Sequence, residues 1–69
     1  MKEELLELHR IEKLLKASEV AELLNISKAF AYQLMNKGEL KTVAIGAARR
    51  VRPEDLHRYI EENIQLPSK

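Results

Sequence analysis

Apolar residues recur at helical spacing at the start of the chain, in a stripe formed by Leu5, Leu8, Ile11 and Leu15. Residues three and four apart share one face of a helix, so the spacing predicts a helix over residues 3–13, within an amphipathic N-terminal segment of residues 1–13. Leu6 and Leu14 fall outside the stripe, which makes the amphipathic pattern imperfect. The stripe is expected to pack on the core of the following domain. The alternative is pairing with a second copy or with a partner's groove.

Residues 17–40 carry the pattern of two short helices joined by a tight turn. The first helix is expected over residues 18–24, and its buried face is expected to consist of Val20, Leu23 and Leu24. Ser27 is a suitable N-cap for the second helix, because its hydroxyl can accept a hydrogen bond from a free amide of the first turn. Gly38 follows the second helix as the C′ residue that commonly ends a helix.

Four positions meet the demands of a helix-turn-helix motif numbered from Ala17. Ala21 is small where the two helices cross closely. Asn25 falls in the turn, where the chain needs a left-handed backbone that Asn tolerates better than most residues other than Gly. Ala31 and Leu34 lie three apart on the face of the second helix that packs on the first. The spacing therefore indicates a motif used for DNA binding.

Beyond residue 40 the apolar period changes to two, because apolar residues alternate with small or polar ones over residues 42–45. This alternation is typical of a strand. Residues 46–48 (Gly-Ala-Ala) predict a loose turn. Residues 50–52 (Arg-Val-Arg) are expected to return as the partner strand, with Val51 turned toward the core.

A last helix is predicted to begin at Pro53, which suits the first helical position, with Glu54 and Asp55 near the positive end of the helix dipole. Its buried stripe is expected to consist of Leu56, Tyr59, Ile60 and Ile64, and Pro67 is expected to stop it. The predicted fold is mainly α with a small β-hairpin. It is a winged helix-turn-helix domain over residues 14–64, preceded by the N-terminal helix and followed by a tail of residues 65–69.

Composition narrows the class of protein. The chain has 69 residues, enough for one small domain, which buries only about 60% of the surface of its unfolded chain. It has no cysteine, and it lacks the apolar run of a signal peptide or of a membrane span. These features predict a soluble, cytoplasmic protein with no membrane partner.

The net charge of +1 is unevenly divided along the chain. Residues 1–24 hold four basic and six acidic residues, residues 25–52 hold six basic and one acidic, and residues 53–69 hold two basic and four acidic. The subtotals are −2, +5 and −2, so positive charge is concentrated in the second motif helix and the hairpin. Such a concentration is typical of nucleic-acid binding. The alternative is a solvated surface with uneven charge.

The pattern as a whole resembles a known family. The run from Ser18 to Ser27 (SEVAELLNIS), preceded by Leu14-Leu15, resembles the opening of excisionase-like domains related to the MerR group. The match continues through Tyr32, Leu34-Met35, Gly38-Glu39-Leu40, Ile45-Gly46 and the run Arg50–Leu56 (RVRPEDL). The resemblance implies a DNA-binding domain of the kind found in phage and transposon excisionases, which bend DNA for an integrase, and in small transcription regulators.

The resemblance also implies base contacts from the second helix and a basic hairpin, the wing, in the neighbouring minor groove. The candidate DNA-binding residues of the recognition helix are Ser27, Lys28, Ala29, Tyr32, Gln33, Asn36 and Lys37. Those of the wing are Lys41, Arg49, Arg50 and Arg52. Phe30 departs from the Thr-like third position of the family's second helix, and that helix also carries less arginine than usual. Lys16 replaces the Ser or Thr that commonly caps the first helix, which implies a weaker helix start.

The chemistry of these side chains fits the two roles. The amides of Gln33 and Asn36 can make bidentate contacts to adenine N6 and N7, whereas Lys28 and Tyr32 can reach phosphates. Lys41 and Arg49 are also expected at phosphates, and Lys37 either there or as a helix C-terminal charge. Arg50 and Arg52 are expected on one face of the returning strand, where a guanidinium can enter a narrow A·T-rich minor groove.

Each of these residues also has an alternative interpretation that involves no contact with DNA. The outward face of the second helix could be a solvated polar face, and the arginines could keep an edge strand soluble. Phe30 is expected to pack at the edge of the core, and the alternative is contact with a thymine methyl group or a partner.

No enzymatic chemistry is predicted, because the chain has no phosphate-cradling glycine-rich loop and no nucleophile with a plausible base. His9 and His57 are expected at the surface rather than in a metal site, and no cofactor or small-molecule ligand is expected. The expected partners are double-stranded DNA, further copies on adjacent sites, and an integrase or RNA polymerase at the nucleoid. The alternative function is a protein-interaction module that uses the same fold, with the N-terminal helix as its dimerisation or partner surface.

Overall fold

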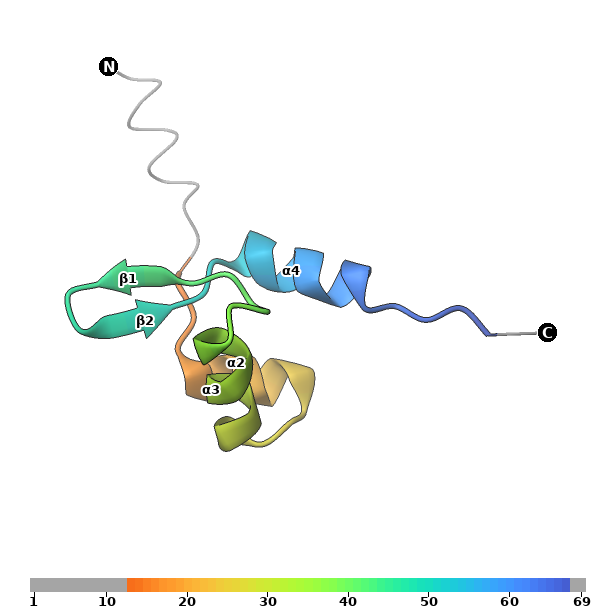
Figure 1. The fold of residues 1–69 in the computed structure, drawn as a ribbon, viewed down its shortest axis with the longest axis horizontal. Helices are drawn as coiled ribbons and strands as arrows, with labels where there is room; N and C mark the ends of the chain where they lie inside the picture. The colour runs from red at the N-terminus through yellow and green to blue at the C-terminus, as the bar shows by residue number, and fades with distance from the viewer. Residues whose placement is uncertain (1–12, 68–69) are drawn as a thin grey trace, which may run out of the picture.

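The structure is a computed structural model that describes residues 13–67. Its elements are, in chain order, α2 (Ala17–Leu24), α3 (Lys28–Asn36), β1 (Val43–Ile45), β2 (Ala48–Arg50) and α4 (Pro53–Glu62). Figure 1 shows α2 and α3 crossing each other, the hairpin projecting to one side of them and α4 extending toward the other. This is the mainly α, winged helix-turn-helix arrangement predicted from the sequence. The predicted N-terminal helix lies outside the described residues, apart from Lys13.

The first turn of α2 is stabilised by the side chain of Glu19, and not by the side chain of the N-cap residue. Lys16 is the N-cap residue, and a lysine side chain has no hydrogen-bond acceptor to offer. The backbone N–H of Lys16 donates to the carboxylate of Glu19 at 2.8 Å, and the same carboxylate pairs with Lys13 Nζ at 2.6 Å. The hydrogen bond from Lys13 lowers the pKa of Glu19, and the Lys16 amide lowers it further. Glu19 therefore offsets the weaker start expected from Lys16.

The turn between α2 and α3 has the predicted backbone. Among the described residues, Asn25 is the only non-glycine residue with a positive φ, and its φ of 58° and ψ of 47° lie in the left-handed region. The Ser27 hydroxyl then caps α3 by accepting a hydrogen bond from the N–H of Phe30 at 3.0 Å. The predictions for Asn25 and Ser27 are confirmed.

The core lies where α2 crosses α3. Ala21 and Ala31 are both buried, so the two helices approach closely, and Leu34 is buried beside them as predicted. Leu23 was expected in the core but is 63% exposed. The eight-residue α2 turns its alanine-rich face toward α3, which leaves Leu23 on the side that faces α4.

Gly38 ends α3 as predicted. Its φ of +78° is a backbone conformation that side-chain-bearing residues rarely adopt, and its N–H donates to the Met35 carbonyl at 3.3 Å. The N–H of Leu40 then reaches back to the Leu34 carbonyl at 3.1 Å, and the Leu40 side chain is only 1% exposed. Leu40 thereby anchors the chain at the base of the hairpin.

The hairpin is tighter than predicted. Ile45 pairs with Ala48, so the turn consists of Gly46 and Ala47 alone, and the predicted three-residue loose turn is wrong. The φ of Gly46 is 61°, and a positive φ at the first turn residue lets a two-residue turn follow the twist of the strands. As a consequence, β2 begins and ends two residues before the predicted partner strand of residues 50–52.

Val51 connects the hairpin to the segment before α2. The N–H of Leu15 donates to the Val51 carbonyl at 2.8 Å, and the N–H of Val51 donates to the Leu15 carbonyl at 2.9 Å. Val51 is fully buried, as predicted, and Pro53 begins α4 at its first position, also as predicted.

The apolar stripe of α4 is only partly buried. Leu56 is buried and Tyr59 is half-buried, whereas the predicted burial of the other two members is wrong. The exposed members are Ile60 and Ile64. The helix ends at its C-cap, Asn63, instead of at Pro67, and the Asn63 side chain donates to the Tyr59 carbonyl at 2.8 Å. The contribution of α4 to the core therefore comes from Leu56 and, in part, from Tyr59.

Candidate nucleic-acid interface

A groove of about 480 Å³ lies between the start of α2, the outward face of α3 and the hairpin. We call it the basic groove. Its polar and charged lining consists of Lys16, Ser18, Lys28, Tyr32, Arg49 and Arg50. The lining contains four cations and no carboxylate, so it presents one sign of charge to a ligand.

The outward face of α3 has the predicted exposure. All seven candidate residues of the recognition helix are exposed, namely Ser27, Lys28, Ala29, Tyr32, Gln33, Asn36 and Lys37. Lys28 and Tyr32 line the basic groove, and Gln33 and Asn36 do not. A ligand seated in the groove would therefore meet Lys28 and Tyr32 together with the hairpin, and it would reach the two amides only by extending along α3.

The two arginines of β2 are not neutralised by carboxylates of the described residues, so their charge is available to a ligand. Arg49 Nη1 donates to Thr42 Oγ1 at 3.3 Å, and Arg50 Nη1 donates to the Arg49 carbonyl at 2.9 Å. Both acceptors are neutral oxygens. Within residues 13–67 neither guanidinium forms an ion pair, and neither does Lys28.

Arg52 does not belong to the hairpin, so the prediction that it shares a strand face with Arg50 is wrong. β2 ends at Arg50, and Arg52 is the N-cap residue of α4. Its Nε and Nη2 donate to the two carboxylate oxygens of Asp55 at 2.6 and 3.0 Å, and its Nη1 lies 3.2 Å from Glu54. The cation is thus neutralised by the carboxylates at the start of α4.

Lys41 is also separated from the basic groove. It lines a different depression with Asp55 and Arg58, and its charge contributes to lowering the pKa of Asp55. The expectation that Lys41 acts together with the wing arginines receives no support from its position.

Asp55 is a buried carboxylate whose ionised form is stabilised by Arg52. Its side chain is 2% exposed. The hydrogen bonds from Arg52 lower the pKa of Asp55, and this effect exceeds that of burial, which acts in the opposite direction. The pair joins the N-cap residue of α4 to the first turn of the same helix.

We expect acid to destabilise the domain through Asp55. Its folded-state pKa lies below that of the unfolded chain, so the pair contributes stability above an unfolded pKa of about 4, and this contribution is lost as the pH falls through the folded pKa. The urea midpoint of the wild type should fall between pH 7 and pH 3. Asp55→Asn should have a lower midpoint at pH 7 and a shallower pH dependence, with the remainder due to carboxylates such as Glu19. Equal pH dependence in both proteins would contradict this role.

Two residues that line the basic groove, Lys16 and Ser18, were not among the DNA contacts predicted from the sequence. Lys16 was considered only as a poor cap, and Ser18 only as part of the family motif. Both lie at the start of α2, and the turn at Asn25 brings α3 back beside them. The clustering of Lys16 with the later cations depends on the crossing of the two helices, which residue spacing alone does not reveal.

No group of three or more potential metal ligands occurs within residues 13–67. His57 is exposed, as expected, and its Nε2 lies 3.4 Å from Glu61, one helical turn further along α4. In the part of the chain that the structure describes, no helix combines the length and the apolar character that crossing a bilayer requires.

The fold and the groove define a helix-turn-helix domain, a class that docks its second helix on DNA. The chain belongs to the family described as "Helix-turn-helix domain", whose model matches residues 14–64. Two proteins of Mycobacterium tuberculosis, from strains CDC 1551 / Oshkosh and ATCC 25618 / H37Rv, are each 40% identical to it over 48 residues. The matched region is 70% of this chain and 62% of each relative, and both relatives bear the name "Putative DNA-binding protein". The chain thus spans less than two thirds of these curated relatives. No solved structure matches the chain significantly.

Proposed function

We propose that this chain is a small, sequence-selective protein that binds double-stranded DNA, with α3 in the major groove and the hairpin in the neighbouring minor groove. The observation that carries the proposal is the basic groove. Its four cations face the same space as the exposed side of α3, and no carboxylate lines that space. A duplex offers the complementary array of phosphates. The names of the mycobacterial relatives point to the same ligand.

Each part of the interface has its own role in this proposal. Gln33 and Asn36 read adenine edges, because their amides can donate to N7 and accept from N6. Lys28 and Tyr32 contact phosphates and set the register of α3 on the duplex. In the wing, Arg49 contacts phosphate, whereas Arg50 enters the minor groove, because the narrow minor groove of A·T-rich DNA has enhanced negative potential.

The small number of contacts favours function in an assembly. Four cations give modest affinity that depends strongly on salt. We therefore propose that the protein acts as several copies on adjacent sites, or beside an integrase or RNA polymerase. As an excisionase it would bend DNA for recombination, and as a small transcription regulator it would act at a promoter. Footprinting distinguishes an array of adjacent sites from a single operator.

Fluorescence anisotropy tests the proposal. A labelled A·T-rich duplex and the corresponding single strand are titrated with wild-type protein at several salt concentrations. If four cations meet phosphates, log K for the duplex should fall with log salt at a slope of about −3 to −4. Lys28→Ala should weaken all duplexes alike, whereas Gln33→Ala should reduce discrimination between sequences. Absence of duplex binding even at low salt would overturn the proposal and favour the protein-interaction module.

A further inference from the structure

The hydrophobic core of residues 13–67 is small compared with the number of apolar residues in this part of the chain. Three of the nine buried hydrophobic residues are alanines, and seven large apolar side chains within residues 13–67 are exposed. A domain of this size depends on most of its available apolar area for stability. A contiguous apolar surface that is exposed in residues 13–67 therefore indicates a site where another segment or molecule packs.

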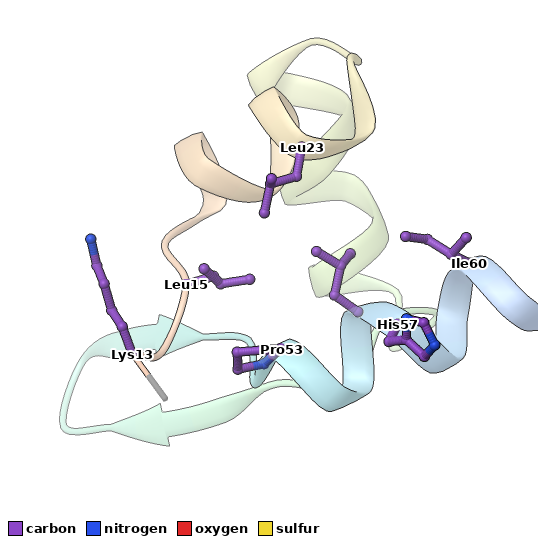
Figure 2. A pocket seen from close by; sticks show the side chains of 7 residues that line it. Lys13, Leu15, Leu23, Pro53, His57 and Ile60 are labelled. Atoms are coloured by element: carbon purple, nitrogen blue, oxygen red, sulfur yellow. The ribbon is translucent and has the colours of Figure 1, made fainter. Parts of the chain in front are cut away.

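Part of this surface forms a groove of about 370 Å³ between α2 and α4, shown in Figure 2. We call it the α2/α4 groove. Its apolar lining consists of Leu15, Leu23, Pro53, Leu56 and Ile60. Leu23 is 63% exposed and Ile60 is 41% exposed, although both were predicted to be buried. Their side chains project from the two helices toward the same space.

We propose that residues 1–12 of the same chain form an amphipathic helix that covers the α2/α4 groove with Leu5, Leu8 and Ile11. The point of attachment supports this occupant. Lys13, which directly follows the segment, lies at the edge of the groove. Leu15, which continues the apolar stripe of the segment, already lines it.

The dimensions of the segment and of the groove agree. At the helical rise of 1.5 Å per residue, the stripe from Leu5 to Ile11 is about 9 Å long, and the stretch of α4 from Pro53 to Ile60 is about 10 Å long. Running back from Lys13, the segment brings Ile11 to the Pro53 end of the groove and Leu5 to the Ile60 end.

Tethering favours the chain's own segment over a second copy. A short linker gives an attached ligand an effective concentration in the millimolar range, well above usual protein concentrations. A helix of twelve residues is marginal on its own in water, so its formation depends on covering its apolar face. The segment contains four acidic and two basic residues, and the α2/α4 groove shares no lining residue with the basic groove. An acidic helix at this position leaves the basic groove free for DNA.

Paramagnetic broadening in NMR spectra tests the position of the segment. The chain has no cysteine, so Glu3→Cys provides a single attachment site for a nitroxide spin label. In ¹⁵N-labelled, spin-labelled protein, the amides of Leu23 and Ile60 should broaden more than that of Ala47 in the hairpin turn. A mixture of ¹⁵N-labelled protein lacking the nitroxide with unlabelled protein carrying it should show no broadening. Broadening in the mixture would assign the groove to a second copy, and absence of selective broadening in either sample would leave the groove uncovered. Both results overturn the proposal.

A matched pair of substitutions tests the energetics. Leu8→Ala removes a leucine of the stripe, and Leu6→Ala removes one from outside it in the same segment. Covering the groove predicts that Leu8→Ala lowers the equilibrium constant for folding about tenfold, measured by urea unfolding, while Leu6→Ala changes it less than about threefold. Equal effects overturn the proposal. Neither readout involves DNA, so the result is independent of whether the proposed DNA-binding function is correct.

Discussion

Replacing Arg49 and Arg50 together by alanine is expected to weaken duplex binding by roughly tenfold to a hundredfold at moderate salt, with little effect on folding. Both guanidiniums line the basic groove, and their hydrogen bonds within the protein go to neutral oxygens, so their charge is available to phosphate. The slope of log K against log salt should become shallower by about two units, since two counterion-releasing contacts are lost. Anisotropy titrations over a range of salt concentrations measure both quantities.

Arg58→Ala provides the matched control for this experiment. Arg58 is an exposed cation on α4 that does not line the basic groove, so its removal lowers the net charge without altering the proposed contact surface. It should leave the salt slope unchanged. The comparison is with Arg50→Ala alone, which also removes one charge, but from the basic groove. A loss of affinity from Arg58→Ala as large as from Arg50→Ala would indicate that only net charge matters. Arg52→Ala is not an equivalent test, because it leaves the buried carboxylate of Asp55 without its partner.

Leu40→Ala is expected to have the largest effect on stability, at about 2–5 kcal/mol. Leu40 is 1% exposed and belongs to the core cluster of buried residues, so its truncation leaves a cavity in the core. A domain of this size has modest stability, and such a loss should leave much of the protein unfolded at 37 °C. Circular dichroism during thermal and urea unfolding measures the change.

Leu66→Ala makes the same chemical change at a position that is 84% exposed. It should alter the free energy of unfolding by less than about 0.5 kcal/mol. If the two variants were equally stable, Leu40 would not be part of the core as the structure describes it.

Features that depend on local chemistry were predictable from the sequence. Asn25, Ser27 and Gly38 each satisfy a backbone requirement of their own segment, a left-handed turn, an N-cap and a helix end, and the structure has all three. Ala31 follows from helical periodicity, because burial on one face depends mainly on spacing. The fold class follows from these elements taken in order.

Features that depend on a choice between possible partners, or on how separate elements meet, were not predictable in the same way. Arg52 was assigned to the wing by the family resemblance and to the face of Arg50 by strand alternation, but Asp55 lies one helical turn further on and binds it. The two-residue turn depends on the register in which β1 meets β2, and the alternation of apolar residues alone does not fix this register. The burial of Leu23 and Ile60 was inferred from apolar character, but burial requires a covering element, which the described part of the chain lacks.

The backbone pairing of Leu15 with Val51 sets a practical limit on how this domain can be shortened. The helix-turn-helix motif begins at Ala17, yet the residue after β2 has both its N–H and its carbonyl bonded to a residue before that point. A fragment that starts at Ala17 would keep both helices of the motif, but it would expose two buried backbone groups next to the wing. The smallest unit that retains a positioned wing therefore begins upstream of Leu15. A fusion joined directly at Ala17 would disturb the hairpin before it disturbed the recognition helix.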